Sequence, residues 1–416
     1  MDPGEPTKKK GPTTKKKGGV LGRKNASGFE EFYADPPVTP AESAEEKNIY
    51  SVSRPFYDRM EECIQRFRAH RRLNTERTNI FNKYLFMGGI DAHPRQFTGM
   101  DPGTLADADK DEIRTMTAVD FIGGAGSRYF EIGDEEHWEI DFEGVVKGFL
   151  SRTIPDIYMY DPSAFEKAAD LIKNFLNYVL MHNACPEYTD NIMAARNICD
   201  IFLPEMRATH ELLDELPGSF NSAAAALFCG DRTVDNLDKQ ENFDKLVNFR
   251  LIALETTTNE EVRKKLAKLD DPAIVRDSET KEETYEVYEI ARPRRQYIKM
   301  FEEQLKQMQM PGKVKPAGRV LLKPAIIEHS YDNLPRPDDV DLSGAPVEEY
   351  LVEDEILAKL QRGMKLKLVV CELNIGIRFI KEVHDIRVSF DTFLPQTLMA
   401  GWKDPDLSDR PPPQAK

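Results

Sequence analysis

The chain has few cysteines and no long apolar run. Its five cysteines are scattered over 416 residues, at positions 63, 185, 199, 229 and 371, without paired spacing. A disulfide framework needs paired cysteines, so we expect reduced thiols and an intracellular protein. No apolar run approaches the roughly 20 residues of a membrane span, and no apolar segment follows the basic N-terminus as in a secretory signal. The sequence therefore predicts a soluble chain without membrane partners.

Motifs of the common enzyme classes are also missing. The chain has no P-loop, no GxGxxG after a strand, no HExxH and no GxSxG. The tripeptide HWE at 137–139 matches half of a zinc deaminase signature but lacks the PCxxC half. His182, Cys185 and Cys199 lack the spacing of known zinc sites, which favours buried cysteines. We expect no catalytic residue, metal or cofactor, although scattered carboxylates leave a two-metal nuclease as the alternative.

Charge is distributed unevenly along the chain. The net charge is −15, but residues 1–27 carry seven Lys and one Arg against two acidic residues, so the remainder carries −21. Segment 1–27 has almost nothing to bury, so we expect it to be disordered. It contains two basic triplets, namely Lys8, Lys9, Lys10 and Lys15, Lys16, Lys17. Such triplets are typical of nuclear import signals or RNA-phosphate contacts, and a solvated tail without function is the alternative.

The strongest strand pattern lies between residues 364 and 395. Leu366 and Leu368 alternate with lysines, and further on Ile386, Val388 and Phe390 alternate with polar residues. This period of two predicts at least two strands of a core sheet, with turns available at 374–376 or 384–385. The segment Cys371–Val383 is apolar enough that a buried helix is an alternative for it.

Helical periodicity dominates the earlier part of the chain. The pattern predicts helices over 55–73, 75–86, 220–227 and 293–309. Two further helices are expected to begin at 162, after the N-cap Asp161, and at about 190, with a kink or end at Pro204. Another is expected to follow the capping box formed by Thr258 and Glu261. A strand is expected over 319–327, moved toward a sheet edge by Pro324.

The expected fold is therefore α+β, with helices of the first three-quarters packed on a mainly antiparallel C-terminal sheet. Polar residues predict a break over 270–283 and an acidic, proline-rich loop over 331–355. The domain prediction is a basic tail (1–27), one large body (28–403) and a second disordered tail (404–416).

Two features suggest contacts with partners. Arginines crowd the end of the 55–73 helix, at Arg66, Arg68, Arg71 and Arg72. They form a candidate basic patch for a nucleic-acid duplex, and a solvated helix end is the simpler explanation. Trp402 follows Gly401 in a polar stretch, so its ring is a candidate hook for a partner's pocket, or it packs back on its own body.

Several co-linear blocks carry a resemblance to a known family. They are GFEEFYADPPVTP (28–40), SRPFYDRMEECIQRFRAHRRL (53–73), FNKYLFMGGID (81–91), NYVLMHNACPEY (177–188) and VVCELNIGIRFIKEVHDIRVSFDTFLPQTLM (369–399). Over about residues 28–403 the chain resembles the Argonaute-binding subunit of the fungal Argonaute siRNA chaperone (ARC) complex.

The resemblance implies a non-catalytic role. We expect the protein in the nucleus, with the cytoplasm as a further location. Similar proteins sit with a second subunit on Argonaute that carries duplex siRNA, restrain slicing and passenger-strand release, and support heterochromatin assembly through histone H3 lysine 9 methylation. The siRNA would then be reached through Argonaute rather than directly. A metal-dependent nuclease and a general nuclear RNA or chromatin scaffold are the alternatives from other classes.

Overall fold

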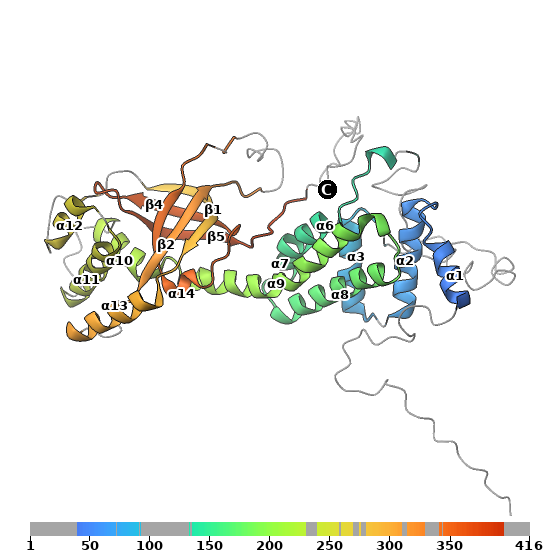
Figure 1. Ribbon diagram of the computed structural model, residues 1–416, viewed down its shortest axis with the longest axis horizontal. Helices are drawn as coiled ribbons and strands as arrows, with labels where there is room; N and C mark the ends of the chain where they lie inside the picture. Colours follow the sequence, from blue (N-terminus) through green and yellow to red (C-terminus); the bar gives the residue numbers. More distant parts are fainter. Residues whose placement is uncertain are drawn as a thin grey trace, which may run out of the picture.

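The computed structural model describes residues 40–71, 73–90, 92, 133, 135–229, 239–257, 259–268, 274–275, 280–309, 314–328, 341–342 and 344–394. Figure 1 shows two lobes side by side, a helical lobe and a lobe built on a sheet, with helix α9 running from one into the other. The α+β prediction is confirmed, with helices in the N-terminal and central parts and the strands of the sheet all after residue 280.

The helical lobe contains the elements from α1 to the first part of α9. They are α1 (Pro40–Ile49), α2 (Phe56–His70), α3 (Thr75–Met87), η1 (Glu135–His137), α6 (Phe142–Gly148), η2 (Phe149–Thr153), α7 (Ile154–Tyr158), α8 (Pro162–Met181), η3 (Pro186–Tyr188) and α9 (Thr189–Glu215). The helices predicted over 55–73, over 75–86 and from 162 are confirmed. As predicted, the Asp161 carboxylate caps α8 by accepting a hydrogen bond of 2.9 Å from the Ser163 amide.

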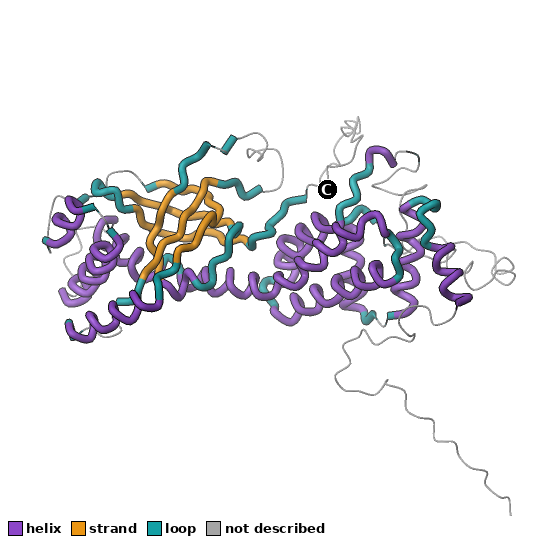
Figure 2. Tube along the Cα trace, in the orientation of Figure 1, coloured by secondary structure: helices purple, strands orange, loops and turns teal. Residues whose placement is uncertain are grey.

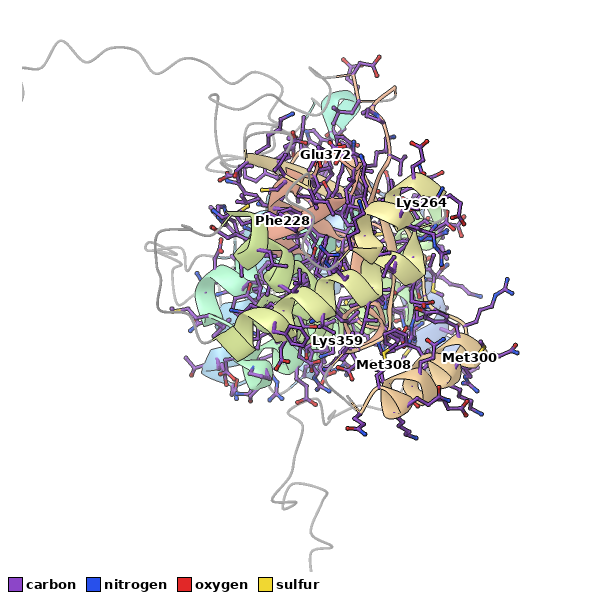
Figure 3. All side chains as sticks on the ribbon, turned by 90° about the vertical axis from the view of Figure 1, so that its left-hand side faces the viewer. Phe228, Lys264, Met300, Met308, Lys359 and Glu372 are labelled. Atoms are coloured by element: carbon purple, nitrogen blue, oxygen red, sulfur yellow. The ribbon has the colours of Figure 1, made fainter. Side chains whose placement is uncertain are left out.

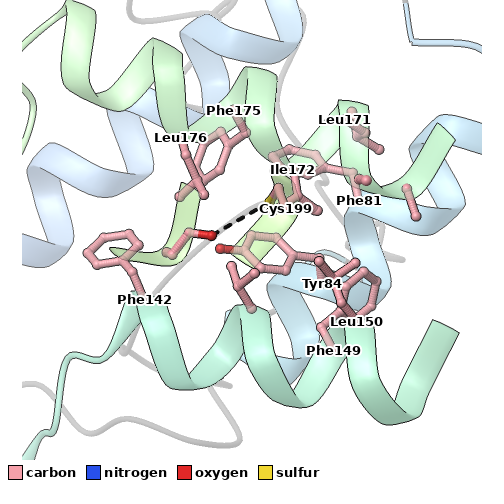
Figure 4. Close-up of a cluster of buried hydrophobic side chains, with 14 of the residues drawn as sticks. Phe81, Tyr84, Phe142, Phe149, Leu150, Leu171, Ile172, Phe175, Leu176 and Cys199 are labelled. Carbon is pink, nitrogen blue, oxygen red and sulfur yellow. Dashed lines mark hydrogen bonds between the residues drawn. The ribbon is translucent and has the colours of Figure 1, made fainter. Parts of the chain in front are cut away.

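Aromatic rings fill the core of this lobe. Tyr84 of α3 meets Phe149 edge-on at 5.5 Å between ring centroids and Phe175 of α8 at 6.2 Å. Figure 4 shows these rings between the helices, with Phe142 at one side and Cys199 bonded to the Ala195 carbonyl of its own helix. Edge-to-face contacts of this kind add to the stabilisation from burial alone.

Helix α9 continues through Pro204, so the predicted helix end at this residue is wrong. The missing proline amide deprives the Asp200 carbonyl of its helical partner, but Asp200 and Pro204 are both exposed, so water can hydrate that carbonyl. On the opposite face Phe202 and Met206 are buried in the helical lobe, while Leu212 is buried in the sheet lobe. Tertiary packing on both sides of the proline therefore keeps the helix intact.

The described strands form one antiparallel sheet in the order β3-β2-β1-β4-β5. Their bounds are β1 (Lys281–Ala291), β2 (Ala317–Pro324), β3 (Glu348–Glu353), β4 (Lys365–Glu372) and β5 (Arg378–Arg387). The predicted strands in 364–395 are confirmed, and the turn between them contains Gly376 at φ 77°, in the left-handed region that glycine adopts without strain. Segment Cys371–Val383 is strand and turn, not a buried helix.

Three predictions for segments of the sheet need correction. The break predicted over 270–283 contains the start of β1, the central strand, whose Tyr285 and Val287 are buried. The loop predicted over 331–355 contains β3 and the start of α14 (Asp354–Leu357), because Tyr350 and Val352 are fully buried in the sheet. Strand β2 lies inside the sheet, and Pro324 is its last residue, where a missing amide costs little.

The two faces of the sheet belong to different cores. Tyr285, Leu366 and their neighbours on one face pack with α14 and with Leu212 at the end of α9. The other face is covered by α10 (Gly218–Cys229), α11 (Lys239–Thr256), α12 (Glu260–Ala267) and α13 (Arg295–Gln307). The helix predicted over 220–227 is confirmed and lies within α10. The helix predicted over 293–309 is confirmed as α13, which is slightly shorter. The N-cap of α12 is Asn259, not Thr258, which lies outside the described residues.

The sheet is strongly curled, as Figure 2 shows. Seen from the end of the sheet lobe, Lys264 of α12, Met300 of α13 and Met308, which directly follows α13, project outward. Both methionines are 55% exposed. These helices therefore form the outer layer of the lobe (Figure 3).

Asn221 of α10 connects the two edge strands of the curled sheet. Its side-chain NH₂ group donates to the Leu351 carbonyl of β3 at 2.9 Å and to the Pro217 carbonyl at 2.9 Å. Its side-chain oxygen accepts from the Ile380 amide of β5 at 2.9 Å. Because the side chain is completely buried, it satisfies polar groups of both edges that water cannot reach.

Replacing Asn221 by Ala should destabilise the protein. The change leaves the Leu351 carbonyl and the Ile380 amide without the bonds that Asn221 supplies, which should lower the free energy of unfolding by about 3 kcal/mol. Urea denaturation followed by circular dichroism measures this. Asn197→Ala, on the exposed face of α9, is the matched control with little expected effect. Equal loss in both variants would contradict the bridging role.

Candidate interaction site

The arginines expected to form a basic patch contact other residues of the helical lobe. Arg66 pairs with Glu62 at 2.9 Å and with Glu45 of α1 at 3.3 Å. The pair with Glu45 joins α1 to α2, whereas the pair with Glu62 lies within α2. Arg72 lies outside the described residues, as do the two lysine triplets and Trp402. The predicted roles of these residues in import, RNA contact and partner binding stay predictions.

Arg68 and Arg71 lie over aromatic rings. The Arg68 guanidinium is 4.8 Å from the centroid of Phe81 and donates to the Asn82 side chain at 2.7 Å. Arg71 is 7% exposed and lies 5.4 Å from the centroid of Tyr178. Cation–π contacts of this kind stabilise the packing of α2 on α3 and α8. The RNA-binding patch stays a prediction. An RNA duplex that bound these arginines would have to compete with their intramolecular contacts.

The three residues considered as possible zinc ligands, His182, Cys185 and Cys199, are buried. Burial raises the pKa of the Cys185 and Cys199 thiols to about 12, so both are protonated at neutral pH. The His182 ring contacts the Glu46 carboxylate of α1. In the part of the chain that the structure describes, no group of three His, Cys, Asp or Glu residues could hold a metal ion.

An apolar pocket opens on the helical lobe between α2, α3 and α6. Its volume is about 80 Å³. The lining residues are Phe56, Met60, Tyr84, Leu85, Gly88, Ile90, Trp138, Glu139, Ile140, Asp141, Phe142, Val145 and Phe175. Three of them, Tyr84, Phe142 and Phe175, belong to the aromatic core in Figure 4, so the pocket floor is rigid. A concave, mainly apolar site with a few polar groups is typical of binding pockets.

Asn191 of α9 fixes one wall of the pocket, a role that no sequence pattern indicates. Its side-chain oxygen accepts from the Phe142 amide at 2.6 Å and the Glu143 amide at 3.2 Å, which caps the N-terminus of α6. Its NH₂ group donates to the Asp141 carboxylate at 2.9 Å. Trp138 contacts Tyr57 of α2 edge-on at 6.1 Å between centroids. Segment 138–142 is thereby held against α2 and α9.

A second feature of functional interest is the junction between the lobes. After β5 the chain returns to the helical lobe, where Val388 and Phe390 are buried. The predicted strand through Phe390 therefore ends at Arg387, because these two side chains pack between helices and not on the sheet. The alternating pattern predicts buried side chains at these positions, but it does not indicate that helices bury them.

Charged groups fasten this returning segment. Arg152, in the π-helical turn η2, binds both carboxylate oxygens of Asp391 at 2.5 Å and donates to the Glu328 carbonyl at 3.0 Å. The Asp391 side chain is 1% exposed. Glu205 of α9 accepts from the Ser389 amide and hydroxyl, both at 2.8 Å. Two bidentate contacts thus anchor Ser389 and Asp391 to the helical lobe.

Replacing Arg152 by Met should destabilise the junction. It leaves the buried Asp391 carboxylate without its cation, which should lower the free energy of unfolding by about 4 kcal/mol. The double variant Arg152→Met with Asp391→Leu should recover much of the loss. Urea denaturation measures both, and Lys315→Met, which breaks an exposed pair with Glu355, is the control with an effect below about 1 kcal/mol. A loss equal to that of the control would contradict the structural role.

The fold and these sites define a two-lobed α+β protein with an apolar pocket and an internally fastened junction. The chain belongs to the family described as Argonaute siRNA chaperone (ARC) complex subunit Arb1, whose model matches residues 17–405. This confirms the resemblance seen in the sequence. None of the described helices is long and apolar enough to cross a membrane.

The chain is also similar to Argonaute-binding protein 1 of Schizosaccharomyces pombe. The two are 32% identical over 252 residues, which is 57% of this chain and 58% of that protein. The match thus spans less than two thirds of the relative. No solved structure matches the chain.

Proposed function

We propose that this protein binds Argonaute as a non-catalytic subunit of an Argonaute siRNA chaperone complex. The observation that carries the proposal is the family match over residues 17–405. The relative named Argonaute-binding protein 1 adds weight to it. In this role the chain acts together with a second subunit, and it reaches siRNA through Argonaute.

The proposed mechanism is restraint of Argonaute while it carries duplex siRNA. A subunit that binds the duplex-holding conformation more tightly than the single-stranded one shifts the population toward the former. Slicing and passenger-strand release are then delayed. In the cell this supports heterochromatin assembly and methylation of histone H3 at lysine 9. The fastening of the two lobes by α9 and by Arg152–Asp391 favours such a mechanism, because a rigid body can oppose a conformational change in its partner.

The proposal predicts a preference for loaded Argonaute. Immobilised full-length protein should capture Argonaute carrying duplex siRNA about tenfold more tightly than Argonaute carrying a single strand. Surface plasmon resonance with both forms measures the ratio. Equal affinities would contradict the restraint mechanism, and no binding to either form would contradict the proposed function.

RNA incubated with the protein and Mg²⁺ or Mn²⁺ should stay intact, whereas metal-dependent cleavage would favour the nuclease alternative.

Nuclear localisation is proposed to depend on the basic segment 1–27. Changing its six triplet lysines to Gln should abolish nuclear accumulation of a fluorescent fusion, because import receptors recognise clustered positive charge. Thermal unfolding and Argonaute capture of the variant should not change. Loss of capture together with the charges would instead place the Argonaute contact in the tail. Undiminished nuclear signal would contradict the import role.

A further inference from the structure

We propose that the pocket beside Trp138 binds a linear basic segment of a partner protein, which inserts one bulky apolar side chain between flanking Lys or Arg residues. The proposal names the chemistry of the ligand and goes beyond association with Argonaute. It rests on the shape and lining of the pocket, on the charge of its rim and on the fixed position of its walls.

The size and lining of the pocket suit one apolar side chain. The volume of about 80 Å³ is half that of a cavity known to bind benzene, about 150 Å³, but this pocket is open on one side, so part of the side chain can lie at the mouth. Phe56, Ile140, Val145 and Phe175 are among its apolar lining residues. Water in such a space finds few hydrogen-bonding partners, so its displacement by an apolar group is favourable.

The rim of the pocket is acidic. Of the lining residues, Glu139 and Asp141 carry negative charge and none is a Lys or Arg. Glu139 is exposed, and so are Glu135 and Glu136 in the preceding turn η1. Basic residues on both sides of an inserted side chain would therefore meet complementary charge, which contributes mainly to specificity and to the association rate.

Tyr57, whose ring contacts Trp138, lies near further carboxylates. Partial desolvation, and then the carboxylates of Asp58, Glu135 and Glu61, raise the pKa of its hydroxyl. These carboxylates come from α2 and η1, on the two elements that meet at Trp138. Acidic residues thus extend from the pocket lining to the surface next to it.

The walls of the pocket are held in place before any ligand arrives. Asn191 fixes residues 141–143 through three hydrogen bonds, at 2.6, 2.9 and 3.2 Å. The pocket floor belongs to the buried aromatic core. A pre-organised site loses little conformational freedom on binding, which favours recognition of a short linear segment.

Gly88 offers a way to fill the pocket without straining the backbone. It lines the pocket at φ −78° and ψ 10°, a conformation open to other residues. A Cβ atom there would meet its nearest neighbours at 3.5, 3.6 and 3.8 Å, which are ordinary contacts. Gly88→Leu therefore places an apolar side chain at the pocket, and Gly88→Ala is the matched control with the smaller side chain.

The test uses a fluorescein-labelled peptide of about ten residues, in which one Leu stands between two pairs of Lys, at a size typical of linear motifs. Fluorescence anisotropy with the full-length protein should show saturable binding. Changing the peptide Leu to Ser, or Gly88→Leu in the protein, should weaken binding about thirtyfold, as expected for a central anchor. Gly88→Ala should bind within about threefold of the unchanged protein, since it adds one methyl group. Thermal unfolding confirms that both variants are folded.

The acidic rim is tested separately, so the proposal does not depend on one variant. Glu139→Lys should weaken binding about threefold to tenfold and reduce its salt dependence, because it reverses an exposed charge at the mouth. Glu302→Lys, an exposed residue of α13 in the other lobe, should leave binding unchanged.

Three outcomes overturn the proposal. The first is equal affinity for the Leu and Ser peptides, and the second is unchanged binding by Gly88→Leu. The third is peptide binding that occurs only after residues 1–27 are deleted, which would identify the chain's own basic segment as the occupant. Because Argonaute is absent from this titration, the proposal and the proposed function can fail independently.

Discussion

The contact between Arg152 and Asp391 is the constraint on which the two-lobed arrangement depends. It joins residues 239 positions apart, and the carboxylate is almost fully buried. A buried ion pair loses the hydration of both charges, so it is favourable only with good geometry and further hydrogen bonds. Here the guanidinium binds both carboxylate oxygens and also the Glu328 carbonyl. The π-helical turn η2 places Arg152 where it can reach both.

In the described residues the chain passes between the lobes at two places, and this contact fastens the second of them. Helix α9 carries buried side chains into both cores, and the segment after β5 returns to the helical lobe beside it, bonded to Glu205 of the same helix. A single linker would let the lobes rotate, whereas two crossings fastened to each other resist rotation. The pocket near Trp138 and the sheet are therefore parts of one body, which suits a protein that acts by holding a partner.

Polar side chains serve as connectors throughout this body. Asn221 joins the edges of the curled sheet, Asn191 caps α6 beside the pocket, and Glu353 of β3 accepts from the Phe220 amide at the start of α10, at 2.7 Å. Gly218 precedes that cap at φ 86°, where an added Cβ would lie 2.1 Å from the Glu353 carboxylate. Buried polar groups that are hydrogen-bonded to the elements around them help to specify one arrangement of those elements.

Elements whose signals are local can be predicted from the amino-acid sequence. The cap at Asp161, the apolar stripe of α2, the strands β4 and β5 with their turn at Gly376, and the family blocks could all be recognised, since each depends on neighbouring residues. Four features follow only from the three-dimensional packing: α9 continues past Pro204, Val388 leaves the sheet, Arg71 lies over aromatic rings, and a pocket forms beside Trp138. Each of these depends on contacts between residues far apart in the chain, and no local pattern contains the packing that stabilises them.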